Sequence, residues 1–276
     1  MARPVDVDAL VLANHRLSDT YNIVELSAPQ IGAAISPGQF VMVKRALGHE
    51  PLLRRPFSVF EVLRDDRARV IGVSLLSKQV GAVTRDLYAL EIGDRLRCLG
   101  PLGRAFSVVN PPTAAWMVAG GVGLAPFPSL AEALRARGTD TTLFYGGRSA
   151  ADVYHLPFFE RLGVHVVVTT EDGSRGEQGR VTGPLERALE AAATTGVMIY
   201  ACGPTPMMRT VAALGARNGR RIEVALEPVM GCGLGGCYSC VVPIRANGAT
   251  SPPRLVRSCV EGPVFAGSEV AWPNLT

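Results

Sequence analysis

The sequence has no long hydrophobic run, no block of like charge and little histidine. Its most apolar runs, such as residues 40–43 and 164–168, are far shorter than the ~20 residues that span a bilayer. The net charge of +4 is spread along the chain, whereas nucleic-acid-binding proteins concentrate lysine and arginine in patches. We therefore expect neither a membrane protein nor a nucleic-acid-binding protein.

The first residues and the histidines argue against two further classes. Residues 1–12 lack the apolar core and the cleavage site of a signal peptide, so we expect a cytoplasmic protein. The four histidines, at positions 15, 49, 155 and 165, are scattered, which argues against a histidine metal site. Because cytoplasmic thiols stay reduced, clustered cysteines in such a chain indicate metal ligands or catalysis before disulfides.

The sequence pattern changes twice along the chain. Residues 5–102 contain short β-type runs separated by turn signals, including a run at 57–60, which is typical of a β-barrel. One short helix is expected there, over residues 86–90. From residue 114 strands alternate with helices, which predicts a parallel sheet covered by helices. The expected strands are 115–119, 141–145, 164–169, 197–201 and 221–224, and the expected helices are 128–137, 184–193 and 206–217.

These patterns divide the chain into three predicted domains. A β-barrel occupies residues 1–108, an α/β domain residues 112–224, and a small cysteine-rich domain residues 225–276, with a proline-rich linker at 110–112. The last domain shows little periodicity and no strong core, so we expect it to need a stabilising cross-link such as a bound metal. Of the two cysteines outside it, Cys98 lies on a predicted strand and is expected to be a small buried hydrophobe.

The cysteine-rich domain carries a specific ligand pattern. Its spacing, C-x4-C-x2-C…C, is the one that binds a plant-type [2Fe–2S] cluster. The four candidate metal ligands are Cys232, Cys237, Cys240 and Cys259. Neighbouring glycines let the backbone curl close enough for its N–H groups to approach the sulfur atoms. The alternative is a structural zinc site, but zinc ribbons favour paired C-x2-C knuckles, and only one such knuckle is present.

Two glycine-containing loops follow predicted parallel strands. Gly120-Gly121-Val122-Gly123 lies between a strand and a helix, where its backbone N–H groups can approach a pyrophosphate. Cys202-Gly203-Pro204 follows another strand, at the edge where open α/β sheets bind ligands. Cys202 is a candidate catalytic residue beside a nicotinamide and a flavin. For each loop the alternative is a tight turn without a ligand, with Cys202 merely buried.

The tetrapeptide Arg55-Pro56-Phe57-Ser58 opens a strand of the barrel. Its arginine can pair with a diphosphate, and its serine hydroxyl can bond to a flavin ring atom. Together with the cysteine loop and the glycine loops, this motif resembles the ferredoxin-reductase-like flavoproteins. The cysteine loop and the residues after Cys259 are most similar to the electron transfer subunits of dihydroorotate dehydrogenase B.

The resemblance implies a fold, cofactors and site residues. It implies FAD across the barrel, NAD in the α/β domain and the cluster in the last domain. It places Arg55, Pro56, Phe57 and Ser58 around the flavin and its phosphates, and Leu76, Ser77 and Lys78 along the ribityl-diphosphate. Gly81-Ala82-Val83-Thr84 stands where the family usually has G-x-G-T, so Val83 replaces a glycine and Thr84 keeps its hydroxyl. The nucleotide residues are Gly120, Gly121, Gly123, Cys202, Gly203 and Pro204.

The implied function is electron relay in pyrimidine (UMP) biosynthesis. Electrons pass from the FMN of a catalytic subunit, through the cluster and FAD, to NAD⁺, in an expected heterotetramer of two subunits of each kind. One alternative is a relay subunit of a hydrogenase, a sulfide dehydrogenase or a ferredoxin:NADP oxidoreductase; another is a non-redox metal-binding module. Arg148 and Arg175 leave NAD and NADP both open, and Glu227 is expected either to face the flavin or to be structural.

Overall fold

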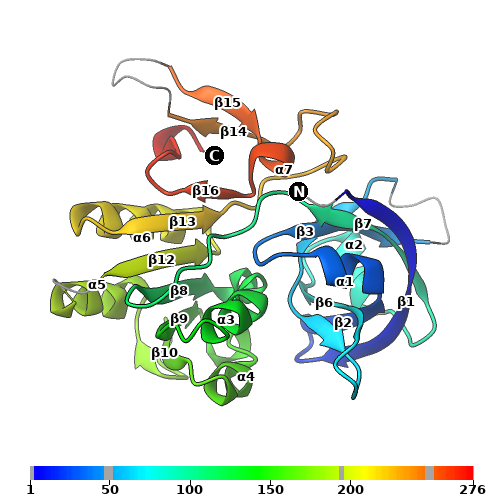
Figure 1. Ribbon diagram of the computed structural model, residues 1–276, viewed down its shortest axis with the longest axis horizontal. Helices are drawn as coiled ribbons and strands as arrows, with labels where there is room; N and C mark the ends of the chain where they lie inside the picture. Colours follow the sequence, from blue (N-terminus) through cyan, green and yellow to red (C-terminus); the bar gives the residue numbers. More distant parts are fainter. Residues whose placement is uncertain (1–2, 47–51, 193–195, 246–251, 276) are drawn as a thin grey trace.

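The computed structural model describes residues 3–46, 52–192, 196–245 and 252–275. A curled antiparallel sheet, a parallel α/β sheet and a small C-terminal unit lie around a common centre (Figure 1). Among the described residues, no helix combines the length and the apolar character needed to cross a membrane.

The N-terminal sheet is built from seven antiparallel strands. They are β1 (Val5–Arg16), β2 (Tyr21–Ser27), β3 (Phe40–Arg45), β4 (Arg55–Ser58), β5 (Val62–Arg64), β6 (Val70–Lys78) and β7 (Arg95–Leu102), in the order β4-β3-β7-β1-β2-β6-β5. Hydrogen bonds from Phe60 N to Ser74 O and from Ser74 N to Glu61 O join the segment after β4 to β6. The sheet thus curls into a barrel whose core includes Cys98, which is buried as expected.

Two helices accompany this sheet, and one of them differs from the prediction. They are α1 (Pro29–Ala34) and α2 (Ala82–Tyr88). The helix expected over 86–90 begins four residues earlier, because the Thr84 hydroxyl accepts hydrogen bonds from Val80 N and Gly81 N and so caps the chain there. Similarly, the strand expected at 57–60 is β4, which ends at Ser58 before the chain crosses to β6.

The second sheet carries the expected alternation of strands and helices. Its order is β11-β10-β9-β8-β12-β13-β16, with parallel strands β8 (Ala114–Gly120), β9 (Thr141–Gly147), β10 (His165–Thr170), β11 (Glu177–Gln178), β12 (Val197–Cys202) and β13 (Arg221–Ala225). The helices are α3 (Phe127–Arg135), α4 (Leu156–Arg161), α5 (Thr182–Ala191) and α6 (Thr205–Arg217), with 3₁₀ turns η1 (Gly121–Leu124) and η2 (Ala150–Asp152). The last expected residue of α5, residue 193, lies outside the described residues.

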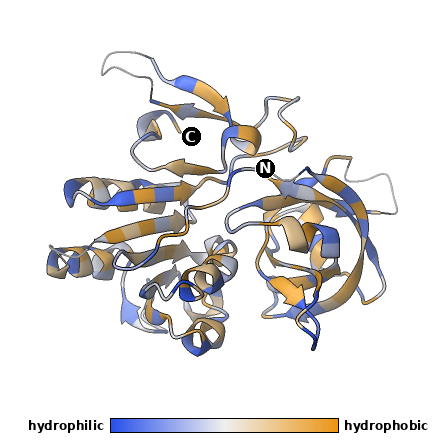
Figure 2. Cartoon of the chain, in the orientation of Figure 1, coloured by the Kyte–Doolittle hydropathy of each residue, from blue (hydrophilic) through white to orange (hydrophobic). Residues whose placement is uncertain are grey.

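The central strands of this sheet are buried on both faces. Met117 packs toward α3 and α4, while the next residue, Val118, packs toward α5 and α6. This follows from the two-residue repeat of a strand, and it explains why these strands are continuously apolar rather than alternating. Figure 2 shows these strands as largely hydrophobic and the covering helices as mixed in hydropathy.

The C-terminal unit is held by more than its cysteines. It comprises β14 (Val241–Ile244), β15 (Arg254–Arg257), α7 (Ser258–Glu261), β16 (Val264–Ala266) and η3 (Trp272–Asn274). Strand β16 pairs antiparallel with β13, so the unit extends the nucleotide sheet. Val242, Val256 and Trp272 are buried in the same core as α5 and α6. The unit therefore shares the core of the nucleotide sheet instead of having a separate one, because its apolar residues are spaced irregularly yet converge on that neighbouring sheet.

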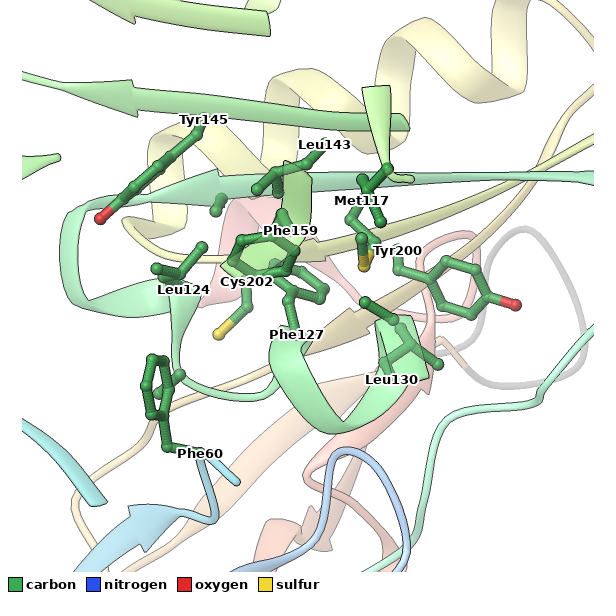
Figure 3. Packing of buried hydrophobic residues seen from close by; sticks show 14 of the residues in the cluster. Phe60, Met117, Leu124, Phe127, Leu130, Leu143, Tyr145, Phe159, Tyr200 and Cys202 are labelled. Carbon is green, nitrogen blue, oxygen red and sulfur yellow. The ribbon is translucent and has the colours of Figure 1, made fainter. Parts of the chain in front are cut away.

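The barrel and the nucleotide sheet share a core. Figure 3 shows Phe60 of the barrel near Leu124 and Cys202, with Phe127 of α3 beside Cys202. Tyr21 on β2 and Phe106 in the linker are buried in the same cluster. This shared core fixes the position of one unit against the other.

Candidate functional site

A cavity of about 750 Å³ opens where the strand order of the second sheet reverses. Numbered in chain order, its seven strands lie as fourth, third, second, first, fifth, sixth and seventh, so the reversal falls between β8 and β12. Ligands of open α/β sheets bind at this point, beyond the carboxyl ends of the strands. Four of the predicted nucleotide residues line the cavity, namely Gly120, Gly121, Gly203 and Pro204.

The two glycine loops approach each other too closely for side chains. A Cβ at Gly123 would lie 2.4 Å from the carbonyl oxygen of Cys202. Gly203 has a φ of +142°, and a Cβ there would lie 3.0 Å from the backbone nitrogen of Gly120. Glycine is therefore required at these positions by backbone contact. Gly123 itself is buried and is not among the residues that line the cavity.

Cys202 and Glu227 form a pair at one wall of the cavity. The Cys202 thiol contacts Glu227 Oε1 at 3.8 Å. Cys202 is completely buried, and burial raises the pKa of its thiol well above the ordinary value. Glu227 faces the cavity, and desolvation by the surrounding protein raises the pKa of its carboxyl group. Because a nucleophile needs a thiolate, this environment suits Cys202 to packing and hydrogen bonding and not to nucleophilic attack.

A second polar cluster, absent from the sequence predictions, joins the two larger units across the cavity. Lys78 Nζ from β6 and the Tyr21 hydroxyl from β2 both lie 2.9 Å from Asp152 Oδ1 in η2. Burial opposes ionisation of Asp152, but hydrogen bonds from Lys78 and Tyr21 outweigh it and lower the pKa of this carboxyl group. Burial and the bond to Asp152 raise the pKa of Tyr21. The cluster therefore holds an ion pair at neutral pH.

The predicted flavin residues lie outside the lining of this cavity, except for Lys78. Arg55 on β4 donates to the carbonyl oxygens of Leu53 and Arg54. Leu76 is buried in the shared core. Ser77 Oγ is buried and has no hydrogen-bond partner among the described residues, so a ligand atom there would satisfy it.

Val83, which stands at the start of α2 where the family usually has glycine, packs inward. The side chain of Val83 is buried in the barrel core. It therefore points away from the N-terminal turn of α2 and leaves only its backbone N–H on that side. The Thr84 hydroxyl is already bonded to Val80 N and Gly81 N. The valine in place of glycine is explained by this packing, since the core fills the space that the side chain needs.

The four loop cysteines are gathered in pairs. Cys240 and Cys259 are buried with their Sγ atoms 3.2 Å apart. Cys237 interacts with Cys232, and hydrogen bonds from Ser239, followed by Cys232, lower its pKa to about 6. Burial raises the pKa of Cys259 to about 12. Leu234 N donates to Cys232 Sγ at 3.3 Å, which is the backbone contact expected around a cluster sulfur.

The four thiolates of this loop fit a [2Fe–2S] cluster, which divides four cysteine ligands between two irons. Gly231 adds to the fit, because a Cβ there would lie 3.1 Å from Cys237 Sγ.

The cysteine loop rests directly on the barrel. A Cβ at Gly233 would lie 2.5 Å from Met42 Cγ of β3, and Cys240 and Cys259 share a core cluster with Met42. Strand β3 pairs with β4, and Met42 is opposite Pro56 in that ladder. The cysteine loop therefore lies one strand away from the predicted flavin motif Arg55–Ser58.

Comparisons with known proteins agree with this arrangement. Residues 227–271 match the iron–sulfur cluster binding domain of dihydroorotate dehydrogenase B, and residues 117–213 match an oxidoreductase NAD-binding domain. A dihydroorotate dehydrogenase B (NAD⁺) electron transfer subunit from Desulforamulus reducens is 36% identical over 265 residues, covering 96% of this chain and 98% of that protein. The chain belongs to this family of electron transfer subunits. The corresponding subunit of Geobacillus thermodenitrificans is 35% identical over 91% of this chain and 92% of its own length.

Solved structures show the same fold. A chain from the NADH-dependent reduced ferredoxin–NADP oxidoreductase superposes with a TM-score of 0.82 at 26% identity, covering 98% of this chain and 91% of that one. A ferredoxin reductase of carbazole 1,9a-dioxygenase, at 22% identity, covers 79% of this chain and 67% of its own with a TM-score of 0.65. As a member of the electron transfer subunit family, the chain is an oxidoreductase subunit that uses FAD, a [2Fe–2S] cluster and NAD.

The family assignment confirms the sequence-based fold class and cofactors. The residues that hold each cofactor remain a prediction, as do the three domain boundaries. Tyr21, Asp152 and Glu171 line the cavity without having been predicted. Glu171 directly follows β10, so its position at a strand end was a signal available in the sequence.

Proposed function

We propose that the chain is the subunit that passes electrons from the FMN of a dihydroorotate dehydrogenase catalytic subunit to NAD⁺, in pyrimidine biosynthesis in the cytoplasm. The observation that carries the proposal is the contact of Gly233 with Met42. It places the cysteine loop against the barrel strand next to Arg55–Ser58, on the same molecule as the cavity between β8 and β12. A relay needs these sites to be contiguous.

Each of the three cofactors has a proposed set of binding residues. Cys232, Cys237, Cys240 and Cys259 hold the cluster; Arg55, Pro56, Phe57, Ser58, Leu76, Ser77, Lys78, Val83 and Thr84 hold FAD; and Gly120, Gly121, Gly123, Cys202, Gly203 and Pro204 hold NAD. The cluster supplies one-electron chemistry, the nicotinamide takes two electrons, and the flavin handles both. The residues of this chain position the groups and exclude water, and no protein side chain needs to act as a nucleophile.

The polar residues around the cavity support NAD as the nucleotide. Glu171 lines the cavity just after the carboxyl end of β10, where its negative charge would repel a 2′-phosphate bound close to it. Of the two arginines that left NADP open, Arg148 places its Nε 3.3 Å from Asp152 Oδ2. Arg175 donates to the carbonyl oxygen of Val153. Arg148 lines the cavity as well, so its pairing with Asp152 offsets its charge there, whereas the contact of Arg175 is with the backbone.

The surface around the cysteine loop supports a protein partner. Several large apolar side chains are exposed there, namely Val229, Leu234, Tyr238, Val241 and Leu255. Large exposed apolar side chains along a functional loop are typical of a surface that a partner protein covers. We propose that the FMN-containing catalytic subunit covers this face, in an assembly of two subunits of each kind, because electrons must enter through the cluster.

The test is to purify the chain anaerobically, alone and together with a candidate catalytic subunit, and to assay iron, flavin and activity. About two irons and one FAD per chain, bleaching by NADH and dihydroorotate-dependent reduction of NAD⁺ in the complex are expected. Size-exclusion chromatography with light scattering gives the stoichiometry. A colourless, zinc-containing chain would reject the relay and would support a non-redox metal-binding module.

A related relay function is the second candidate. The superposition with the NADH-dependent reduced ferredoxin–NADP oxidoreductase chain favours it, because that match covers 98% of this chain. The same purified complex separates the two candidates. Reduction of ferredoxin or NADP⁺ without any response to dihydroorotate would transfer the chain to this second class.

A further inference from the structure

Ser239 occupies a special place in the cysteine loop. It stands between Cys237 and Cys240 in the C-x2-C segment. Its hydroxyl oxygen lies 3.2 Å from Cys237 Sγ and accepts a hydrogen bond from Gly231 N at 2.8 Å. Because the oxygen is the acceptor toward Gly231, its hydrogen remains available for the sulfur.

The local backbone is built to keep this hydroxyl over the sulfur. Tyr238, between Cys237 and Ser239, has a φ of +58°, a left-handed conformation that is uncommon for a residue other than glycine. The Arg257 guanidinium lies 5.2 Å from the centre of the Tyr238 ring and donates to the carbonyl oxygen of Gly235. This contact holds the turn that brings Ser239 back toward Cys237.

Gly231 is equally constrained. A Cβ at this position would lie 3.1 Å from Cys237 Sγ and 3.2 Å from Ser239 Oγ. A side chain here would press on both the sulfur and the hydroxyl, so glycine favours the close approach of the backbone N–H to Ser239. The chain Gly231 N–H, Ser239 O–H and Cys237 sulfur is therefore a connected hydrogen-bond path.

Metal ligation decides the direction of the hydrogen bond between the Ser239 hydroxyl and Cys237 Sγ. A thiolate bound to iron carries no hydrogen, so in the loaded protein only the Ser239 hydroxyl can donate. Of the other ligands, Cys232 Sγ accepts from the backbone N–H of Leu234, and Cys240 and Cys259 are buried against each other. Among the described residues, Ser239 supplies the side-chain hydroxyl that contacts a ligand sulfur.

We propose that Ser239 is a positioning residue that raises the reduction potential of the cluster. The reduced cluster carries one more negative charge than the oxidised cluster, so a donor on its sulfur stabilises the reduced form more. The inference rests on the proposed function only in requiring that the loop hold a [2Fe–2S] cluster. As a consequence, the cluster accepts an electron from the partner more readily than the same four cysteines would allow without this hydrogen bond.

The test is an EPR-monitored redox titration of the cluster in the anaerobically purified full chain. We expect Ser239→Ala to shift the one-electron equilibrium about tenfold toward the oxidised form, which corresponds to a midpoint lower by about 59 mV. Ser239→Thr retains the hydroxyl and should titrate close to the wild type. Ser129→Ala is the control, because the Ser129 hydroxyl donates to the carbonyl oxygen of Pro126 at the start of α3 in the nucleotide domain, and its midpoint should not move.

The outcomes separate the two proposals. Iron analysis of the wild type tests the cluster itself, and an iron-free wild type would reject the proposed function. With the cluster present, an unchanged midpoint in Ser239→Ala would overturn the tuning role. Should the alanine variant fail to retain iron, the near-isosteric pair Ser239→Thr and Ser239→Val makes the comparison: a higher midpoint for threonine supports the role, and equal midpoints overturn it.

Discussion

Replacing Gly233 with alanine should loosen the contact between the cysteine loop and the barrel. Gly233 has a φ of +73°, and a Cβ there would lie 2.5 Å from Met42 Cγ and 3.0 Å from Leu102 Cδ1. A left-handed backbone costs a non-glycine residue about 1–2 kcal/mol. Overpacking a filled core adds about 1–3 kcal/mol. The substitution therefore costs about 2–5 kcal/mol of conformational and packing energy. The loop either remains in place under that strain or moves away from β3.

The measurement compares iron retention and the rate of electron transfer between cluster and flavin in Gly233→Ala and in a matched variant. Gly236→Ala is the control, because Gly236 is in the same loop, its φ is not in the left-handed region and a Cβ there meets nothing within 4 Å. We expect the first variant to lose iron faster and to transfer electrons more slowly, and the control to behave like the wild type. Equal behaviour of the two variants would refute the claim that the loop is seated on Met42.

Two further predictions concern the cavity. Gly123→Ala would place its Cβ 2.4 Å from the Cys202 carbonyl oxygen. We therefore expect this variant to bind NADH at least about tenfold more weakly in a fluorescence titration, a loss of about 1.4 kcal/mol. The control variant Gly183→Ala, in α5, should bind NADH normally, because the atom nearest to its Cβ would be 3.7 Å away. Asp152→Asn should destabilise the chain by about 1–3 kcal/mol at neutral pH, because it breaks a partly buried ion pair with Lys78. The folded pKa of Asp152 is lowered, so its contribution is present above the ordinary value of 3.8 and is lost as the pH falls through the lowered value. Thermal denaturation of wild type and Asp152→Asn should therefore converge in acid, and a gap independent of pH would contradict this reasoning.

Local patterns were enough to identify much of the protein. The spacing of Cys232, Cys237, Cys240 and Cys259 indicated the cluster because four ligands within a short stretch must share a loop. The alternation of strands with helices from residue 114 predicted a parallel sheet, because parallel neighbours need a crossover connection, which is usually a helix. The glycines after β8 and β12 indicated the nucleotide loops, because both strands end at the same edge.

Contacts between distant elements were decided only by the tertiary structure. Tyr21 and Asp152 are 131 residues apart, and no local pattern connects them, because their meeting depends on how the barrel packs on the nucleotide sheet. The same holds for Val83, whose fit in the barrel core explains the missing glycine, and for β16, which joins β13 and gives the C-terminal unit a core. The sequence by itself determined which chemical groups the chain can hold, since ligand identity and spacing are local. The packing of separate elements decided which side chains surround those groups, because register and burial depend on the whole chain.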